Sequence, residues 1–462
     1  MLDSEFLAAA RALIRADTVT DRGNLGAISV LEPLCEEAGL TPRRLPAADT
    51  SDRDANLLAG PGGGSAASGD PLLLVTHLDT VDPGPRERWK TDPFDLTIEG
   101  DRAFGLGVAD VKLDALCKLW AARRLKDVPL KRPFYFLGTY GEEAGLRGAR
   151  AFMKTPPFRP FAVACGEPSE LVLCHAHKGY AVVRVRIRSR RGTSTAASPA
   201  VVVAWEGKAA HSSTPHLGVN AIDLALDDLA CPGVPYSMAL NGGASANTIP
   251  ARAEAVVYMR PGCGPSLWRE VEQAAPSEET WANVTTMLPV ALRLRALWRE
   301  HVAALRPAED PRFQPSTAVA NVTRVRTERD VLELTMDARL LPEHHVDALI
   351  AAVQEEAVRL STEAFEVSIA VDRATNGMSL PETNPFLMAC GEALASVGLA
   401  SVPKAKPTST EAGVFARAGI PALVFGPSPS TGNAHTANEF AQLDQVERAI
   451  AGYEAILRRV CG

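Results

Sequence analysis

The stretch LLLVTHLDTV, residues 72–81, decides how the rest of the chain is interpreted. It opens with a continuous apolar run that has turn-forming segments on both sides, a pattern typical of a strand buried on both faces of a parallel sheet. His77 and Asp79 are two residues apart, so an extended backbone points both side chains to the same side. The stretch therefore predicts a buried strand whose end presents an imidazole and a carboxylate, a pair suited to a metal site.

The overall composition excludes several classes of function. The chain has 462 residues, of which 46% are hydrophobic and 22% charged, and its formal net charge is −7 at pH 7. This length favours more than one domain, and the acidic balance argues against binding to nucleic acid or to a membrane surface. No apolar run reaches the roughly 18 residues that a membrane span needs. The eight cysteines form no CxxC pair and the first residues do not resemble an export signal, so a cytoplasmic enzyme is expected.

The pattern of an apolar strand followed by polar side chains recurs along the chain. Three further runs show it: PFYFLGT (133–139) before Glu142 and Glu143, FAVAC (161–165) before Glu167, and PALVF (421–425) before a loop that carries His435. Strands separated by helices predict a doubly wound, mostly parallel α/β sheet. The carboxyl ends of such strands meet at one edge of the sheet, and Asp110, at the start of a predicted helix, can reach the same edge.

The hydropathy pattern changes in the middle of the chain. Runs such as YAVVRVRIRS (180–189) alternate apolar and polar residues, as half-exposed antiparallel strands do. The sequence therefore predicts a discontinuous catalytic domain, residues 1–178 and 378–462, with a lid domain of residues 179–377 inserted into it. We expect the lid to be α+β and ferredoxin-like, and two faintly similar segments within it suggest that it is doubled.

The residues at the predicted sheet edge form a chemically coherent set. Two imidazoles and three carboxylates suit a pair of divalent ions about 3.5–4 Å apart, and a central carboxylate can bridge them. The consecutive Glu142 and Glu143 add to this prediction, since one can bind metal while the other accepts a proton from water.

Longer segments in the same order carry a family resemblance: THLDTVDPG (76–84), DPFDLTIEGDRAFGLGVADVK (92–112), GTYGEEAGLRGAR (138–150), CGEPSELVLCHAHKGY (165–180), GKAAHSSTPHLGVNAI (207–222) and GPSPSTGNAHTANEF (426–440). With these the chain resembles the co-catalytic zinc amidohydrolase and peptidase family. That family includes acetylornithine deacetylase, succinyl-diaminopimelate desuccinylase, aminoacylases, carboxypeptidases and aminoacyl-histidine dipeptidases. The segment TEAGVF (410–415) is most similar to acetylornithine deacetylase, whereas the long predicted lid is more similar to that of the dipeptidases.

The resemblance implies a role for each candidate residue. It implies that His77 and Glu167 bind one metal ion, that Glu143 and His435 bind the other, and that Asp110 bridges the two. It implies that Glu142 is the general base, that Asp79 orients His77, and that His211 donates a hydrogen bond to the oxyanion. It also implies that Asn247, with Arg339 or Arg260, binds a substrate carboxylate. His211 falls in the predicted lid, so its role requires lid closure or a partner subunit that delivers it.

The resemblance further implies a metal-dependent hydrolase that cleaves the amide bond of a small N-acyl amino acid with a free carboxylate. The expected cofactor is two zinc ions, with cobalt or manganese as alternatives. A dipeptidase or carboxypeptidase is the first alternative, and a binding protein without turnover is the second. The sequence also departs from the family pattern, because Leu113 and Asp114 stand where a glycine is usual. A homodimer and a monomer with a doubled lid both remain open.

Overall fold

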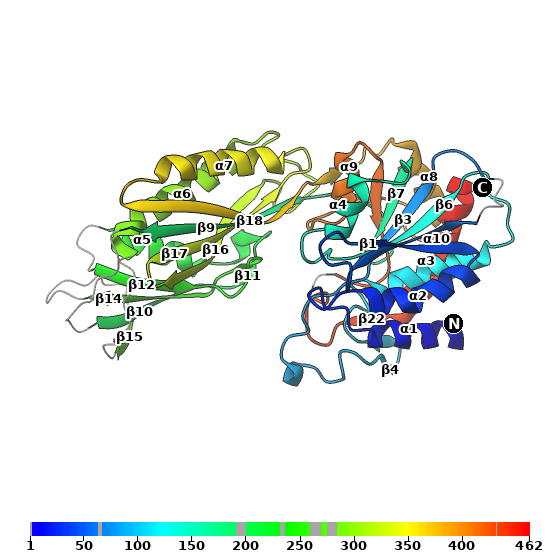
Figure 1. The fold of residues 1–462 in the computed structure, drawn as a ribbon, viewed down its shortest axis with the longest axis horizontal. Helices are drawn as coiled ribbons and strands as arrows, with labels where there is room; N and C mark the ends of the chain where they lie inside the picture. The colour runs from blue at the N-terminus through cyan, green and yellow to red at the C-terminus, as the bar shows by residue number, and fades with distance from the viewer. Residues whose placement is uncertain are drawn as a thin grey trace. The chain divides into compact units, whose positions relative to one another are not determined.

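The computed structural model describes residues 2–62, 67–190, 200–231, 236–258, 269–274, 284–430 and 432–462. The chain divides into two compact units (Figure 1). We call Met1–His177 with Met378–Gly462 the discontinuous unit, and Lys178–Gly377 the inserted unit. Arg260 lies outside the described residues, so nothing follows here about its predicted role.

A mixed sheet forms the centre of the discontinuous unit (Figure 1). Its order is β1 (Leu40–Pro46), β2 (Ala55–Pro61), β6 (Phe134–Thr139), β3 (Leu72–His77), β7 (Ala162–Gly166), β21 (Ala422–Phe425), β8 (Cys174–His177) and β19 (Met378–Ser379), with β20 (Lys404–Lys406) beside β8. The central strands β6, β3, β7 and β21 run parallel to one another. Antiparallel strands flank them, so the expected α/β class is confirmed, with its parallel part at the centre of the sheet.

The apolar run of β3 is continuous because helices cover both faces of this sheet. Leu72 and Leu74 pack on one side, and Leu73 and Val75 pack on the other. The hydrophobic core on the side of Leu72 and Leu74 is completed by five helices: α1 (Ser4–Arg15), α2 (Leu25–Glu37), α3 (Lys112–Arg124), α8 (Pro385–Ser396) and α10 (Leu443–Cys461). The hydrophobic core on the side of Leu73 and Val75 is completed by α4 (Arg147–Lys154) and α9 (Ala412–Arg417). The strand that ends at His77 is therefore anchored from both sides.

A buried polar network supports the end of β3. The ammonium of Lys118 and the hydroxyl of Thr76 donate to the same oxygen of Asp114, each at 2.7 Å. The hydroxyl of Tyr453 donates to the other oxygen of Asp114 at 2.5 Å. All four side chains are buried, so each polar group requires the partners that the others supply. Asp114, which departs from the family pattern, thus helps to fix the residue directly before His77.

The inserted unit is built on an antiparallel sheet. Among the described residues its order is β15 (Arg269–Ala274), β10 (Ala200–Glu206), β14 (Arg252–Tyr258), β12 (Tyr236–Gly242), β16 (Val319–Glu328), β17 (Val331–Leu340), β9 (Gly179–Ser189) and β18 (Phe365–Thr375). Helices α5 (Ala221–Leu229), α6 (Val284–Ala304) and α7 (Val346–Leu360) bury one face of this sheet (Figure 1). This one-sided burial explains the alternation in residues 180–189, where Val183 and Val185 lie in the core and Arg186 is exposed.

Smaller elements complete the two units. The discontinuous unit contains a small sheet of β4 (Thr97–Glu99), β5 (Arg102–Phe104) and β22 (Phe440–Gln442), and a short 3-10 helix η1 (Arg86–Arg88). The inserted unit contains the pair β11 (Ala210–His211) and β13 (Thr248–Ile249), and a second 3-10 helix η2 (Pro215–Leu217).

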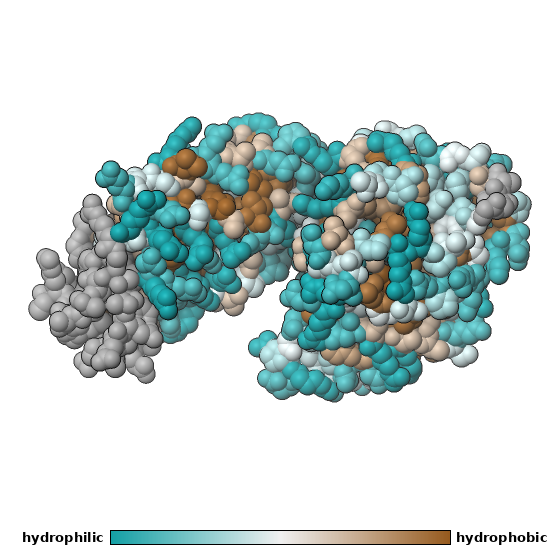
Figure 2. All heavy atoms as spheres, in the orientation of Figure 1, coloured by the Kyte–Doolittle hydropathy of each residue, from teal (hydrophilic) through white to brown (hydrophobic). Residues whose placement is uncertain are grey.

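Searched over the described residues, the helices include none that is long and apolar enough to cross a bilayer. The face drawn in Figure 2 shows hydrophobic patches on both units, surrounded by hydrophilic residues. The cysteines that the structure describes are all free thiols, and most of them are buried.

Candidate active site

The candidate residues of the discontinuous unit come from loops at one edge of its sheet. His77 ends β3, Glu142 and Glu143 follow β6, Glu167 follows β7, His435 lies between β21 and β22, and Asp110 lies two residues before α3. The parallel strands β3, β6, β7 and β21 all end at this edge, which is where open α/β sheets place their ligands. The sequence-predicted metal ligands are therefore brought together by the parallel centre of the sheet.

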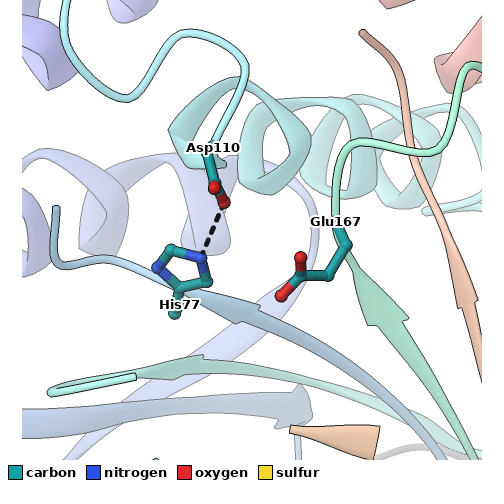
Figure 3. A group of neighbouring side chains, drawn as sticks. All are labelled: His77, Asp110 and Glu167. Carbon is teal, nitrogen blue, oxygen red and sulfur yellow. Dashed lines mark hydrogen bonds and ion pairs between the residues drawn. The ribbon is translucent and has the colours of Figure 1, made fainter. Parts of the chain in front are cut away.

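The first group of possible ligands is His77, Asp110 and Glu167 (Figure 3). The Nε2 atom of His77 lies 3.1 Å from Oδ1 of Asp110. The ligand atoms of all three residues lie within 4.8 Å of one another, and the carboxylate of Glu167 points toward the imidazole (Figure 3). His77 and Glu167 are buried, and the side chain of Asp110 is 11% exposed, so this group lies largely below the surface.

The second group of possible ligands is Asp110, Glu143 and His435. The Nε2 atom of His435 lies 2.8 Å from Oε1 of Glu143 and 3.3 Å from Oδ2 of Asp110. His435 adopts a φ of 60°, a left-handed conformation that is uncommon for residues other than glycine. The two oxygens of Asp110 therefore face different groups, Oδ1 toward His77 and Oδ2 toward His435.

Glu142 lies beside both groups. It forms a third cluster with His77 and Glu143, again with ligand atoms within 4.8 Å of one another. Its residue is only 5% exposed. Gly141, directly before it, has a φ of 61°, and a Cβ there would lie 2.9 Å from the side chain of Arg147. The turn that presents the two glutamates therefore depends on glycine at this position.

Asp79 binds the loop of these two glutamates. Its carboxylate accepts hydrogen bonds from the backbone N–H groups of Glu142, at 3.0 Å, and Glu143, at 3.2 Å, and from the hydroxyl of Thr20, at 2.8 Å. The Nδ1 atom of His77 lies 3.0 Å from the backbone oxygen of Asp79 and 3.8 Å from its carboxylate. Asp79 thus contacts His77 mainly through its backbone, while its carboxylate fixes the glutamate turn.

Three further acidic or basic side chains belong to this site, although sequence reasoning assigned them no role. The carboxylate of Glu439 accepts hydrogen bonds from the backbone N–H groups of Gly107, Ala109 and Asp110, at 2.8–3.1 Å. Lys406 donates to Oε2 of Glu167 at 2.9 Å. Glu411 accepts a hydrogen bond from Thr139 at 2.9 Å. Glu439 and Glu411 fall inside the matched segments and could have been noted, whereas no sequence pattern indicated Lys406.

The electrostatics of the site favour bound positive charge. The charge of Glu143, helped by the hydrogen bonds that the His435 ring donates to Asp110 and Glu143 and opposed by burial, raises the pKa of His435 to about 11. Burial alone would raise the pKa of Asp110, but hydrogen bonds from His435 and His77 hold it below its usual value. Burial raises the pKa of Glu167, and the positive charge of Lys406 partly offsets this rise. Without metal, the carboxylates therefore favour protonated imidazoles. Metal ions that bind here would displace those protons.

The donor set of imidazole nitrogens and carboxylate oxygens fits two divalent first-row ions.

The remaining candidates lie in the inserted unit, where they form a cluster of their own. His211 pairs with Thr248 across β11 and β13, and Ser212 donates its N–H to the backbone oxygen of Asn247 at 2.9 Å. Arg339 approaches the hydroxyl of Ser212 at 3.2 Å and stacks on the ring of Tyr180, 3.5 Å from its centre. The structure therefore brings His211, Asn247 and Arg339 together around Ser212.

Arg339 has a second, acidic neighbour in this cluster. Its Nε atom lies 3.5 Å from Oδ2 of Asp337, and both side chains are buried. Asn321 donates to the other oxygen of Asp337 at 2.8 Å and to the backbone oxygen of Ser212 at 3.0 Å. These contacts make Arg339 part of the support for the His211 segment. Its predicted grip on a substrate carboxylate stays a prediction.

Comparisons with known proteins agree with the resemblance noted in the sequence. The family model described as peptidase family M20/M25/M40 matches residues 73–459. Acetylornithine deacetylase from Klebsiella pneumoniae (strain 342) is 32% identical over a region that covers 61% of this chain and 75% of the deacetylase. The structure of aminoacylhistidine dipeptidase from Vibrio alginolyticus is 15% identical, with a TM-score of 0.68 over 99% of this chain and 96% of that chain. An M20 family metallo-carboxypeptidase from Sulfolobus solfataricus is 17% identical, with a TM-score of 0.63 over 99% of both chains.

Proposed function

Because this chain belongs to the peptidase family M20/M25/M40, we propose that it is a metal-dependent amidohydrolase. Its proposed substrate is a small N-acyl amino acid with a free carboxylate. Water adds across the amide bond, so that the acyl carbon gains a hydroxyl and the nitrogen leaves as an amine. The 32% identity to an acetylornithine deacetylase supports an acyl group over a peptide as the first choice.

The observation that carries this proposal is the position of Asp110 between two ligand groups. One oxygen of its carboxylate faces His77, and the other faces His435. Glu167 completes the first group and Glu143 the second. When bound, two divalent ions would polarise the scissile carbonyl and lower the pKa of the attacking water. Zinc suits this mixed nitrogen and oxygen donor set, as do cobalt and manganese.

Glu142 is the proposed general base. It neighbours His77 and Glu143, so its carboxylate lies beside both groups without being needed as a ligand in either. In this position it accepts a proton from the attacking water and passes that proton to the leaving amine nitrogen. Asp79 supports the step by holding the backbone N–H groups of Glu142 and Glu143.

Residues of the inserted unit are proposed to bind the substrate. The proposed role of His211 is to stabilise the negative charge that develops on the carbonyl oxygen. Its Nδ1 atom accepts a hydrogen bond from the backbone N–H of Ser213 at 3.2 Å and lies 2.6 Å from the hydroxyl of the same residue, so in the neutral ring Nε2 carries the proton. Asn247 and Arg339 are proposed to bind the substrate carboxylate.

Mass-spectrometric turnover of a mixed substrate pool tests this function. The full-length protein is stripped of metal and reloaded with zinc or cobalt, then incubated with N-acetyl amino acids, N-succinyl amino acids and dipeptides that include X-His. We expect metal-dependent loss of an N-acyl amino acid, and no loss with the stripped protein. Loss of dipeptides alone would replace the deacylase with a dipeptidase. Metal binding without loss of any class would favour a binding protein without turnover.

A further inference from the structure

A buried lysine contacts one of the predicted metal ligands. Lys406 ends β20, and its Nζ atom lies 2.9 Å from Oε2 of Glu167. The side chains of Lys406 and Glu167 are only 8% and 10% exposed, respectively, so solvent screens this ion pair weakly. The charge of Lys406 therefore acts on whatever binds at the group formed by His77, Asp110 and Glu167.

We propose that Lys406 weakens the binding of a divalent cation at the position of His77 and Glu167, relative to the position of Glu143 and His435. This inference rests on the proposed metal-dependent function. An ammonium next to the ligating carboxylate repels a doubly charged ion at close range. The ammonium also forms a hydrogen bond to one oxygen of Glu167, so the other oxygen of this carboxylate is the one that would bind the metal.

The charged partner of the ligands at the second position is an imidazole. In the part of the chain that the structure describes, the ion pairs recorded for Glu143 and for Oδ2 of Asp110 are with the imidazole of His435. An imidazole must lose its extra proton to bind metal, so it adds no positive charge to the loaded site. The side chain of His435 is also 41% exposed, whereas that of His77 is 1% exposed. A cation at the second position therefore keeps more contact with water.

The asymmetry sets an order of filling. The first ion binds to Asp110, Glu143 and His435, and the second ion binds more weakly to His77 and Glu167. Lys406 is thus a positioning residue that acts on the metal through Glu167. The occupancy of the weaker position therefore depends on the concentration of free metal.

A cobalt titration tests the proposal without measuring turnover. Metal-free, full-length protein is titrated with Co²⁺ and followed by its visible absorption, which reports the ligands directly. Wild-type protein is expected to bind in two phases. In Lys406→Met the weaker phase should tighten by about tenfold or more, a change on the scale that neighbours of ligands produce. Lys404→Met is the matched control because Lys404 is an exposed lysine of the same strand, and it should titrate like wild type.

Two outcomes of that titration would overturn the proposal. If the weaker phase of Lys406→Met stays unchanged, the lysine charge has no influence on the site. If it becomes weaker still, Lys406 orients Glu167 and aids binding. Equal affinities at both positions of the wild type would also contradict the proposal while leaving the proposed hydrolase intact. A wild-type protein that binds no cobalt would contradict both.

A second pair of variants keeps the proposal testable if Lys406→Met fails to fold. Glu143→Gln should remove the tight phase of the cobalt titration, whereas Glu167→Gln should remove the weak one. The reverse assignment would place the tight ion beside Lys406 and overturn the inference. Circular dichroism of each variant before titration shows that the fold is retained.

Discussion

The Glu142→Gln variant is expected to lose turnover by about 10²–10⁴-fold in kcat, the usual contribution of a general base. Glutamine keeps the size of the side chain but does not accept the proton of the attacking water. The two metal ions should remain bound, because Glu142 is not needed in either of the groups that share Asp110. Steady-state kinetics and the metal content of the purified variant, measured together, check both halves of this expectation.

A surface glutamate provides the matched control. Glu170 follows Glu167 by three residues and is exposed, so Glu170→Gln makes the same chemical change nearby without touching the site. Its kcat should equal that of the wild type. Wild-type turnover by Glu142→Gln would remove Glu142 from the mechanism. Loss of metal by that variant would make Glu142 a ligand instead of the base.

The Asp110→Ala variant should weaken both metal positions at once. Removing a neighbour of a ligand typically costs about 10–100-fold in metal affinity, so loss of a shared ligand should cost at least that at each position. The physical reason is that Oδ1 of Asp110 faces His77 while Oδ2 faces His435. Inductively coupled plasma mass spectrometry after dialysis against a weak chelator would give the number of ions that remain.

Variants that act on one position only serve as the comparison. Glu167→Ala should release one ion, and the other should stay with Glu143 and His435. An Asp110→Ala protein that also keeps one ion at wild-type affinity would show that the carboxylate is not shared. The two-position geometry would then be wrong even if the enzyme is active.

Much of the site could be predicted from sequence because it follows from the order of strands. Each parallel strand of the sheet centre ends in a loop at the same edge, so a polar residue after a short apolar run is placed there by topology alone. His77, Glu143 and Glu167 all follow this rule. The antiparallel strands β1 and β2 were not predicted, because β1 is mostly exposed and contains two prolines, and β2 ends in Gly60 and Pro61, which are unusual within strands.

The supporting contacts could not be read from sequence, because they join distant segments. The carboxylate of Glu439 holds the backbone of Gly107, Ala109 and Asp110, which lie more than 300 residues earlier in the chain. Lys406 reaches Glu167 across a sequence separation of 239 residues. No periodicity or spacing reports such pairs, since they exist only once the sheet has brought the loops together.

The role of Asp79 shows the same limit at short range. An extended segment predicts that His77 and Asp79 share one side, and their proximity follows from that. The carboxylate of Asp79, however, bonds to the backbone of Glu142 and Glu143 from the neighbouring strand. Spacing along one strand indicates which residues meet, but the partner of each oxygen depends on the loop of another strand.

Locating the metal ions in crystals of the zinc-loaded wild-type protein, by anomalous scattering, tests the central claim most directly. We expect two peaks on either side of Asp110, one near His77 and Glu167 and the other near Glu143 and His435. A single ion, or ions bound away from Asp110, would contradict the account.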